Sequence, residues 1–367
     1  HFEAVNIWYW ATEDLEWYDP EQAVTKDGKL QLTMIKDSDK HPGFNFVSAM
    51  IQSWNKFCFQ GGYLEVKVSL PGDGSASGFW PAAWALGNLG RAGYGATTDG
   101  LWPYTYNSCD EGVLVHQTNP GLSNLPGQRL NACVCKGDHP SPGIGRGAPE
   151  IDIFEGSTAG GVSSMSMSLQ LAPFDYHYQI QLDHTKILSA VGTGVNQTSS
   201  NDYLGGPLQQ CASGSHFIDS AWRDGKAYQT YGFEYEPGPD GYLQWYSGPH
   251  GVWRLESDAI GPNQLSRVNR RMIPEEPMYI ILNFGMSKSF SYVDLDNLKF
   301  PSTMYIDYVR LYQHPDKIRL SCDPEDRPTA KYIQDHARAY FNPNITTWLA
   351  TNYSIPEYSL DNNCHKS

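Results

Sequence analysis

The stretch GAPEIDIFEGS, residues 147–157, places three acids on one short segment and interleaves them with apolar residues. Residues two apart on a β-strand share a face, so Glu150 and Asp152 point one way while the isoleucines that follow each of them point into a core. Glu155 breaks this alternation, and one bulged residue in the strand would return it to the acidic face. The segment therefore predicts a strand with one apolar face and three carboxylates crowded on the other.

Crowded carboxylates are costly for stability and useful for acid–base chemistry. Like charges at short range oppose ionisation, so we expect at least one of the three groups to keep its proton with a raised pKa. Retaining glycoside hydrolysis uses two carboxyl groups about 5 to 5.5 Å apart, one as nucleophile and one as acid/base. Glu150 and Glu155 fit these roles if they share a face, with Asp152 between them and hydrogen-bonded to Glu150. The alternative is a solvated acidic strand edge, against which the interleaved apolar residues argue.

Alternation of apolar and polar residues recurs along the chain and predicts further strands. In KLQLTMI, for example, Leu30, Leu32 and Met34 face one way and the polar residues face the other. Clusters of Gly, Pro, Ser and Asp separate these segments. Strands are predicted at residues 29–35, 63–70, 227–236, 241–247, 277–286 and 304–313. Many short strands without intervening helical patterns predict an all-β fold, an antiparallel β-sandwich.

Two regions depart from the strand pattern. Residues 88–149 are rich in Gly, Pro and Asn and carry three cysteines, as expected of a long functional loop held by disulfides. Residues 314–367 form a tail, in which 328–341 show apolar residues near helical spacing before Pro343. We expect one domain at 1–313 with the long loop inserted, and a short helical C-terminal extension packed on the outside of the sandwich.

Composition and charge exclude several classes of partner. The chain has 367 residues and a formal net charge of −14, which disfavours nucleic acid because phosphate binding needs clustered Lys and Arg. Aromatic residues make up 13% of the chain, which suits a neutral polymer better. No run of 18 apolar residues is present, so no membrane segment is predicted. No signal-peptide pattern is visible at His1, so we expect a processed or shortened form that acts as a monomer.

Seven cysteines and three N-glycosylation sequons, at Asn196, Asn344 and Asn352, favour the secretory pathway, and hence a secreted or cell-surface protein. The odd count leaves one free thiol, for which Cys58 in an apolar strand context is the candidate. Cys322 and Cys364 both lie in the tail and are expected to pair. Two further bridges, with three connectivities open, are then expected among Cys109, Cys133, Cys135 and Cys211.

EIDIFE resembles the catalytic strand of glycoside hydrolase family 16, the group of laminarinases, lichenases and related β-glucan enzymes. GYLEVKVSLP resembles the early strand of that family, GFWPAAWALG its aromatic cleft strand, and PMYIILNFGMS and MYIDYVRLYQ its closing strands. The resemblance covers residues 5–313. It implies a β-jelly-roll sandwich whose long loops form a cleft. LEWYDPEQAVTKDGKLQLTM, GRAGYGATTDGLWPYTYNSCDEG and SLQLAPFDYHY resemble one branch in particular, the fungal and stramenopile-like proteins linked to β-1,6-glucan in cell walls.

Carried over position by position, the resemblance makes Glu150 the nucleophile, Asp152 its assisting acid and Glu155 the acid/base. It makes Trp80 and Trp84 cleft residues that stack on sugar rings. These two tryptophans are four apart, so on a regular strand they share a face. The remaining candidate substrate-binding residues are Trp102 and Trp245 in loop or cleft segments, Asn283 in a closing-strand motif, and Gln170.

Two features depart from the family pattern. Gln170 stands where simple laminarinases usually place a histidine, and an amide hydrogen-bonds a sugar but cannot carry a proton charge. The segment from Trp84 to Glu150 is much longer than in the simple enzymes, so we expect it to close one end of the cleft and to favour attack at chain ends. No cofactor is required, although a structural calcium near Asp307 is one expectation and a backbone-bonded aspartate the other.

The sequence thus predicts a retaining hydrolase of β-glucan, with laminarin-like β-1,3-glucan that carries β-1,6 branches as the expected substrate. A transglycosylase that remodels cell-wall glucan is the first alternative, because it differs only in the acceptor that enters the site. A non-catalytic glucan-binding module on the same sandwich is the second, and a structural wall protein the third. Neither of the last two needs crowded carboxylates.

Overall fold

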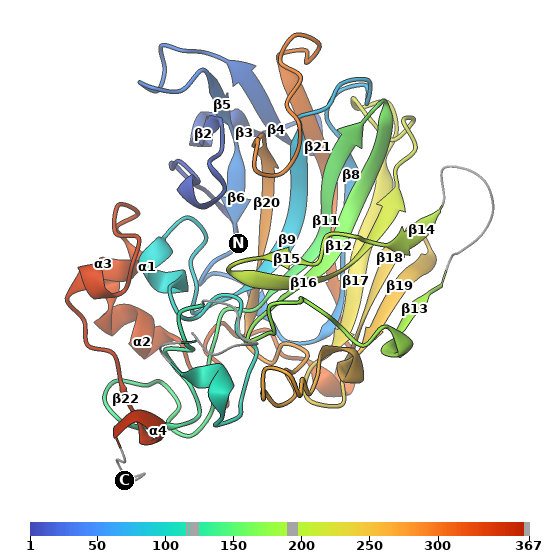
Figure 1. The fold of residues 1–367 in the computed structure, drawn as a ribbon. Coiled ribbons are helices and arrows are strands. Elements are labelled where there is room, and N and C mark those ends of the chain that lie inside the picture. The colour runs from blue at the N-terminus through green and yellow to red at the C-terminus, as the bar shows by residue number, and fades with distance from the viewer. Residues whose placement is uncertain (115–116, 118–124, 189–196, 363–367) are drawn as a thin grey trace.

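Strands form at all six predicted places, and they assemble into two large sheets packed face to face (Figure 1). The computed structural model describes residues 1–114, 117, 125–188 and 197–362. The predicted strands are β4 (Lys29–Lys36), β8 (Gly62–Ser69), β17 (Gln229–Glu236), β18 (Tyr242–Ser247), β20 (Met278–Gly285) and β21 (Ser302–Tyr312).

The first sheet carries the acidic strand at its centre. Its order is β1-β6-β20-β9-β11-β12-β16-β14, with β15 on β16 and β7 on β20, and its pairings are antiparallel. The strands not yet given are β1 (Glu3–Ala4), β6 (Met50–Gln52), β7 (Cys58–Phe59), β9 (Trp80–Gly87), β11 (Glu150–Ala159), β12 (Val162–Leu171), β14 (Thr198–Ser200), β15 (Gly205–Gly206) and β16 (Gln209–Phe217).

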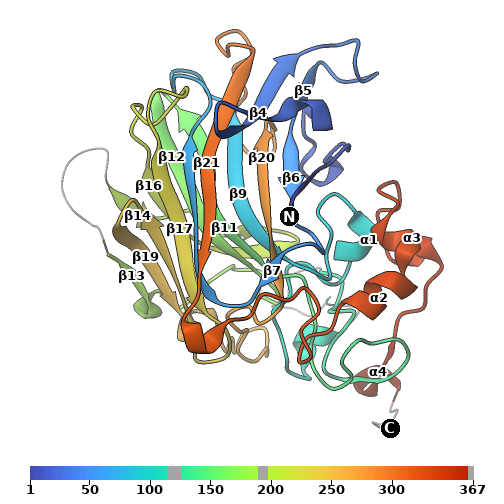
Figure 2. The ribbon, with the colours of Figure 1, turned by 180° about the vertical axis from the view of Figure 1, so that it is seen from behind.

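The second sheet lies behind the first in the view of Figure 1 and in front of it in Figure 2. Its order is β13-β19-β18-β17-β8-β21-β4-β5-β2, with β3 on β4, and it is antiparallel except for the parallel pair β2–β5. A separate pair, β10–β22, joins the long loop to the tail. The remaining strands are β2 (Glu16–Tyr18), β3 (Ala23–Lys26), β5 (Phe46–Ser48), β10 (Val134–Lys136), β13 (Thr185–Ile187), β19 (His250–Glu256) and β22 (Glu357–Tyr358).

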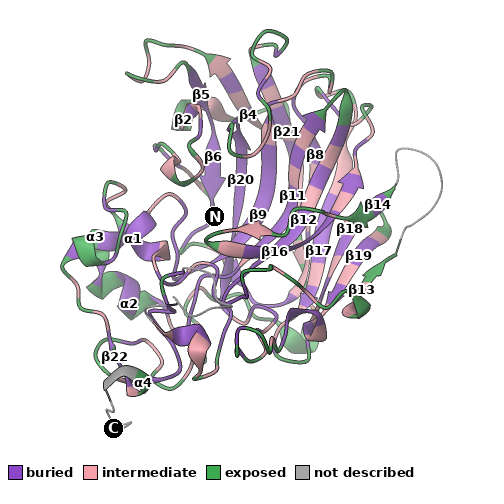
Figure 3. Ribbon diagram, viewed as in Figure 1, coloured by how far each residue is buried: buried purple, intermediate pink, exposed green. Residues whose placement is uncertain are grey.

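The main core lies between the two sheets, as alternation requires. On β8, Leu64 and Val66 are fully buried while Glu65 and Lys67 face outward, and this banding is visible on the strands in Figure 3. Burying apolar area in this way contributes about 25 cal/mol per Å² and is the main force that holds the sheets together. The sandwich predicted from the strand pattern is therefore confirmed.

Helices are few and lie mostly to one side of the sandwich. The predicted helix over 328–341 forms, but as two short helices that meet at His336, whose backbone leaves the helical region. Both views place these two helices beside α1 of the long loop (Figures 1 and 2). The helices are α1 (Gly95–Thr98), α2 (Ala330–Asp335), α3 (Ala337–Tyr340) and α4 (Ser359–Asn362), and the 3-10 turns are η1 (Trp10–Thr12), η2 (Pro20–Gln22), η3 (Glu111–Val113), η4 (Leu182–His184), η5 (Ser257–Ile260), η6 (Pro315–Lys317) and η7 (Leu349–Thr351).

A second apolar cluster joins the long loop, the tail and the outward side of the first sheet. Trp84 of β9, Leu89 of the loop and Tyr340 and Trp348 of the tail all belong to it. The Tyr340 hydroxyl donates to the Leu89 carbonyl at 2.6 Å. The tail thus packs on the loop as well as on this side of the sandwich.

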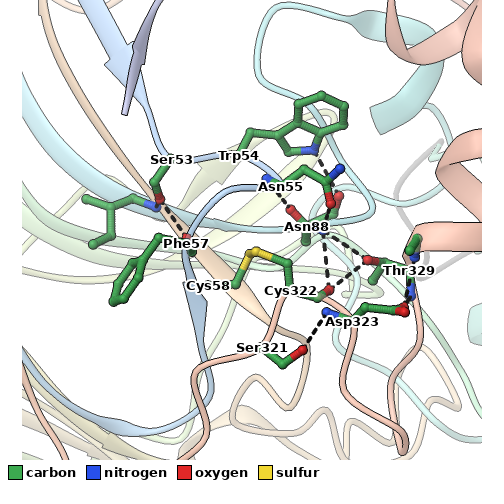
Figure 4. The surroundings of a disulfide bond; sticks show 12 residues. Ser53, Trp54, Asn55, Phe57, Cys58, Asn88, Ser321, Cys322, Asp323 and Thr329 are labelled. Carbon is green, nitrogen blue, oxygen red and sulfur yellow. Dashed lines mark hydrogen bonds between the residues drawn. A yellow bond between two sulfur atoms is a disulfide. The ribbon is translucent and has the colours of Figure 1, made fainter. Parts of the chain in front are cut away.

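The disulfides correct two predictions. Cys58 is not free but bonded to Cys322, and the surrounding Asn88 and Thr329 side chains hydrogen-bond to each other at 3.0 Å (Figure 4). The predicted Cys322–Cys364 bridge is therefore wrong, and Cys364 lies outside the described residues. A buried apolar strand context suits a disulfide as well as a thiol, and sequence cannot show that the tail returns to β7.

The long loop is cross-linked as expected, through Cys109 and Cys133. Cys135 is disulfide-bonded as well. The free, buried thiol is Cys211 on β16, so the expectation that Cys211 takes part in a bridge is wrong. Its cross-strand partner is Gln170 of β12.

Candidate active site

The acidic segment is β11, and its ladder is interrupted where the sequence predicts a bulge. The pairing with β12 shifts between Asp152 and Glu155, and the pairing with β9 shifts between Asp152 and Phe154. Ile153 and Phe154 both belong to the core between the sheets. The bulge returns Glu155 to the face that carries Glu150 and Asp152, so the three carboxylates share one side of the first sheet.

Each carboxylate accepts hydrogen bonds from a different element. Trp102 of the long loop donates its Nε1–H to Glu150 Oε2 at 2.8 Å. Trp80, the first residue of β9, donates its Nε1–H to Glu155 Oε1 at 3.2 Å. The long loop therefore positions Glu150, and β9 positions Glu155.

Asp152 is held by the neighbouring strand. It is 2% exposed, and its Oδ2 accepts from Ser168 Oγ at 2.7 Å and from Gln170 Nε2 at 3.0 Å. The same Ser168 hydroxyl lies 3.5 Å from Glu155 Oε2, at the limit of a hydrogen bond. Two donors on one oxygen favour the ionised form of Asp152, so this residue is the fixed negative charge between the glutamates.

Burial and crowding raise the pKa of all three acids. Burial is the main cause of the upward shift in the pKa of Glu150, to which the charges of Asp152 and Glu155 add, and the bond from Trp102 opposes it. Burial and the charge of Asp152 raise the pKa of Glu155 to about 8. Burial raises the pKa of Asp152 to about 6, against the bonds from Ser168 and Gln170. Glu155 therefore keeps a proton to a higher pH than an exposed glutamate does.

The predicted tryptophan pair lies on the carboxylate side of β9, but the two rings differ in surroundings. Trp80 stacks on Phe290 with ring centroids 4.2 Å apart and planes 4° from parallel, so one of its faces is covered. Trp84 is 8% exposed and donates its Nε1–H to Asn283 Oδ1 at 2.8 Å. Trp80 thus lies beside Glu155, and Trp84 and Asn283 form a hydrogen-bonded pair.

Trp245 is placed elsewhere. Its ring is fully buried in the core between the sheets, and its Nε1–H donates to the backbone carbonyl of Asp152 at 2.7 Å. A ring in that position supports β11 from behind and does not face the side on which a sugar would lie. Gln170, by contrast, lies on the carboxylate side, where it contacts Asp152.

The N-terminal segment contributes residues that the sequence analysis did not single out. Asn283 Nδ2 donates to the Tyr18 hydroxyl at 3.1 Å, which donates in turn to Asp14 Oδ2 at 2.9 Å. Burial is the main cause that raises the pKa of Tyr9, and the charges of Glu150 and Asp14 add to the shift. The density of aromatic and acidic residues in WYWATEDLEWYD, 8–19, is the signal that was available.

Nothing in the described residues favours a metal centre. No group of three or more His, Cys, Asp or Glu side chains there is arranged to hold an ion. Asp307 binds Lys29 Nζ at 2.8 Å through one oxygen and Lys67 Nζ at 3.1 Å through the other. Two ammonium groups on the same carboxylate would repel calcium, so the charge around Asp307 argues against the calcium expected there. Within the described residues, no helix is both long and apolar enough to cross a membrane.

The fold is similar to that of solved glucanase structures. The catalytic domain of an endo-1,3-beta-glucanase (laminarinase) from Thermotoga petrophila RKU-1 superposes with a TM-score of 0.51 at 20% identity, over 86% of this chain and 91% of that one. At this identity the likeness concerns the architecture alone, and the sandwich has the β-jelly-roll fold of that domain.

The sequence is similar to fungal proteins associated with β-glucan synthesis. The beta-glucan synthesis-associated protein SKN1 of Candida albicans is 46% identical over 98% of this chain, and the beta-glucan synthesis-associated protein KRE6 of Saccharomyces cerevisiae is 43% identical over all of it. The chain spans about half the length of these relatives, 48% and 51% respectively. The model of the family "Beta-glucan synthesis-associated protein SKN1/KRE6/Sbg1" matches residues 1–364. This chain therefore belongs to the SKN1/KRE6/Sbg1 family of β-glucan synthesis-associated proteins.

Proposed function

We propose that this chain is a retaining glycoside hydrolase that acts on β-glucan, with β-1,3-linked, β-1,6-branched chains as its substrate class. The observation that carries the proposal is the trio on β11, in which two glutamates flank a fixed aspartate and each has its own donor. A module that only binds glucan gains nothing from three buried acids whose pKa values are all raised. Family membership supports glucan as the polymer.

The first step transfers the glycosyl group to the enzyme. In its ionised form, Glu150 attacks the anomeric carbon, and the bond from that carbon to the leaving oxygen breaks with its electron pair on the oxygen. Glu155 gives its proton to that oxygen, which is the role for which its raised pKa of about 8 suits it. The Trp102 N–H holds the attacking carboxylate, and Asp152 keeps the proton on Glu155.

The second step releases the sugar. Glu155, now ionised, takes a proton from an incoming hydroxyl, whose oxygen bonds to the anomeric carbon and displaces Glu150. Water as the acceptor completes hydrolysis, and a sugar hydroxyl completes transfer. The names of the relatives, which refer to β-glucan synthesis, favour transfer as the second candidate, since a chain that is passed to another chain is not lost.

Variants of the two glutamates test the chemistry. Glu150→Gln should abolish turnover of laminarin and leave folding and glucan binding intact, because volume and hydrogen bonds are kept. Glu155→Ala should lower the rate of laminarin hydrolysis by roughly a hundredfold to ten-thousandfold. The same substitution should lower the rate far less on a substrate with an activated leaving group, and azide should restore part of the lost rate. A Glu150→Gln chain within about tenfold of the parent would contradict the proposal.

Product analysis separates hydrolysis, transfer and mode of attack. Transfer predicts oligosaccharides longer than the substrate when a short acceptor is added. The long loop reaches Glu150 through Trp102, and we propose that it closes one end of the site, so that attack starts at chain ends. Short products of uniform length should then appear within the first minutes. An early ladder of sizes would contradict the closed end and leave the roles of the glutamates unaffected.

We also propose that the chain works in the secretory pathway or at the cell surface. The Cys58–Cys322 and Cys109–Cys133 disulfides persist only where the surroundings are oxidising. Asn344 and Asn352, each at the start of a sequon, are exposed, as a glycan requires. Loss of mass on treatment with an N-glycosidase after expression in a eukaryotic host would support this placement, and unchanged mass would count against it.

A further inference from the structure

The outward face of the second sheet carries a groove of about 630 Å³, separated from the carboxylates by the whole thickness of the sandwich. Strands β8, β17 and β18 supply most of its lining. Leu64 and Val66 of β8 point into the core, so the residues that alternate with them face outward. The lining side chains that matter here are those of Tyr63, Glu65, Gln229, Thr230, Glu234 and Tyr246.

Two tyrosine rings meet above a glycine in this groove. Gly232 pairs with Glu65 on one side and with Tyr246 on the other. A Cβ at Gly232 would lie 3.0 Å from Cε2 of Tyr63, so the missing side chain is what lets that ring lie close to the sheet. The rings of Tyr63 and Tyr246 are 5.0 Å apart at 66°, and Tyr312 stacks on Tyr63 at 6.0 Å. The arrangement leaves an aromatic corner beside open polar groups.

Neutral donors, not cations, hold the acidic side chains of the groove. Glu234 accepts from the hydroxyls of Tyr242 at 2.8 Å and Tyr246 at 2.7 Å, and Glu65 accepts from that of Tyr312 at 3.3 Å. No salt bridge to Glu65 or Glu234 is found in the part of the chain that the structure describes. The groove is lined by neither Lys nor Arg. Its hydrogen-bonding side chains are therefore two carboxylates, one amide and the hydroxyls of Tyr63, Thr230 and Tyr246.

This combination suits a neutral, hydroxyl-rich chain. The C–H face of a sugar ring packs on an aromatic ring, and sugar hydroxyls donate to carboxylates and amides. Two carboxylates, on a chain with net charge −14, repel nucleic acids and acidic polysaccharides. We propose that the groove is a second carbohydrate-binding site that holds a β-glucan chain remote from the carboxylates. The choice of glucan among neutral polysaccharides rests on the proposed function.

Such a site would hold a long or insoluble substrate near the enzyme without taking part in the reaction. Two parts of one glucan, or two neighbouring glucan chains, could occupy the groove and the carboxylate face at the same time. This raises the local concentration of substrate at the carboxylates. Its contribution should therefore grow with the length of the glucan and vanish for an oligosaccharide too short to occupy both places.

The experiment measures binding in the turnover-free Glu150→Gln chain by its retardation in gels that contain laminarin. Tyr246→Ala removes one ring, and Glu234→Gln removes a charge at constant volume. Each should weaken binding roughly fivefold. Tyr305→Ala is the matched control, because Tyr305 of β21 lies on the same sheet but does not line the groove. This variant should leave retardation unchanged. In parallel, Tyr246→Ala in the active parent should lower the rate on insoluble glucan and not on a short oligosaccharide.

Several results would overturn the proposal. The proposal fails if Tyr246→Ala and Glu234→Gln are retarded by laminarin as strongly as the parent. It also fails if Tyr305→Ala weakens retardation as much as those two variants do. Equal losses on the short and the insoluble substrate would show that the variants act through the carboxylate face. A concentration-dependent dimer in sedimentation that Tyr246→Ala abolishes would make a second copy of the chain the occupant. A parent that binds glucan through Tyr246 yet cleaves none would refute the hydrolase and leave the groove intact.

Discussion

At the scale of single residues, the same side-chain chemistry takes different roles because its surroundings differ. Asp152 receives two hydrogen bonds from β12, which favour its charge, whereas Glu155 receives one from Trp80. The charge kept on Asp152 then opposes ionisation of Glu155 and, with burial, raises its pKa to about 8. Burial thus raises the pKa of Glu155 most, and the charge of Asp152 adds to that shift.

This coupling predicts the pH dependence. The rate kcat/KM should fall on the alkaline side as Glu155 loses its proton, near pH 8. Asp152→Asn removes the neighbouring charge, so ionisation of Glu155 becomes easier, its pKa falls, and the alkaline limb should move down by about one pH unit. The control Ser166→Ala, opposite Glu155 but not bonded to Asp152, should keep the limb in place. An unmoved limb in Asp152→Asn would show that the charge of Asp152 does not set the pKa of Glu155.

At the scale of elements, the short edge strand β7 shows how a local segment is stabilised from far along the chain. It pairs with β20 over two residues only, Met278 with Phe59 and Tyr279 with Cys58. The disulfide from Cys58 to Cys322, 264 positions away, ties this strand to the start of the tail. A bridge that closes so long a loop removes much entropy from the unfolded chain.

Replacing Cys58 and Cys322 together by alanine should therefore lower the free energy of unfolding by about 2 to 5 kcal/mol. Calorimetry under non-oxidising conditions for the variant and the parent gives the Tm shift. Cys211→Ala is the comparison, since Cys211 is buried but free and loses only packing. A double variant that melts with the parent would mean that the cross-link does not stabilise the fold.

At the scale of the whole molecule, the tail and the long loop form one unit with the carboxylate face. Arg129 of the loop places its guanidinium 3.5 Å from the centre of the Trp348 ring, and Arg91 donates to the Tyr340 carbonyl at 2.6 Å. The loop that the tail covers carries Trp102, which holds Glu150. The tail therefore acts on the site without touching it.

Deletion of residues 314–367 should consequently cost both stability and activity. The cut uncovers the apolar cluster around Trp84 and Leu89, and we expect aggregation or a non-cooperative thermal transition, together with loss of turnover. Solubility, near-ultraviolet circular dichroism and laminarin hydrolysis report the three effects. Leu349→Ser, at an exposed position of the tail, should change none of them. A shortened chain with the Tm and activity of the parent would make the tail a separate appendage.

The sequence by itself determined the strands, the sandwich and the bulged acidic strand. These features depend on alternation between neighbours, and the side of a strand on which a residue lies is local information. Glu150, Asp152 and Glu155 are for this reason on one face as predicted. The Cys109–Cys133 bridge, between cysteines 24 positions apart in one loop, was within the expected set.

Only the tertiary structure decided which distant segments meet. Cys58 pairs with Cys322, Tyr18 reaches Asn283, and Trp245 lies behind β11 although its sequence context suggested the carboxylate side. An apolar or aromatic residue has the same local pattern whether it faces a core, a second loop or solvent. Its place is settled by the burial of area between segments hundreds of positions apart, and that free energy belongs to the packed molecule and not to any one stretch of the chain.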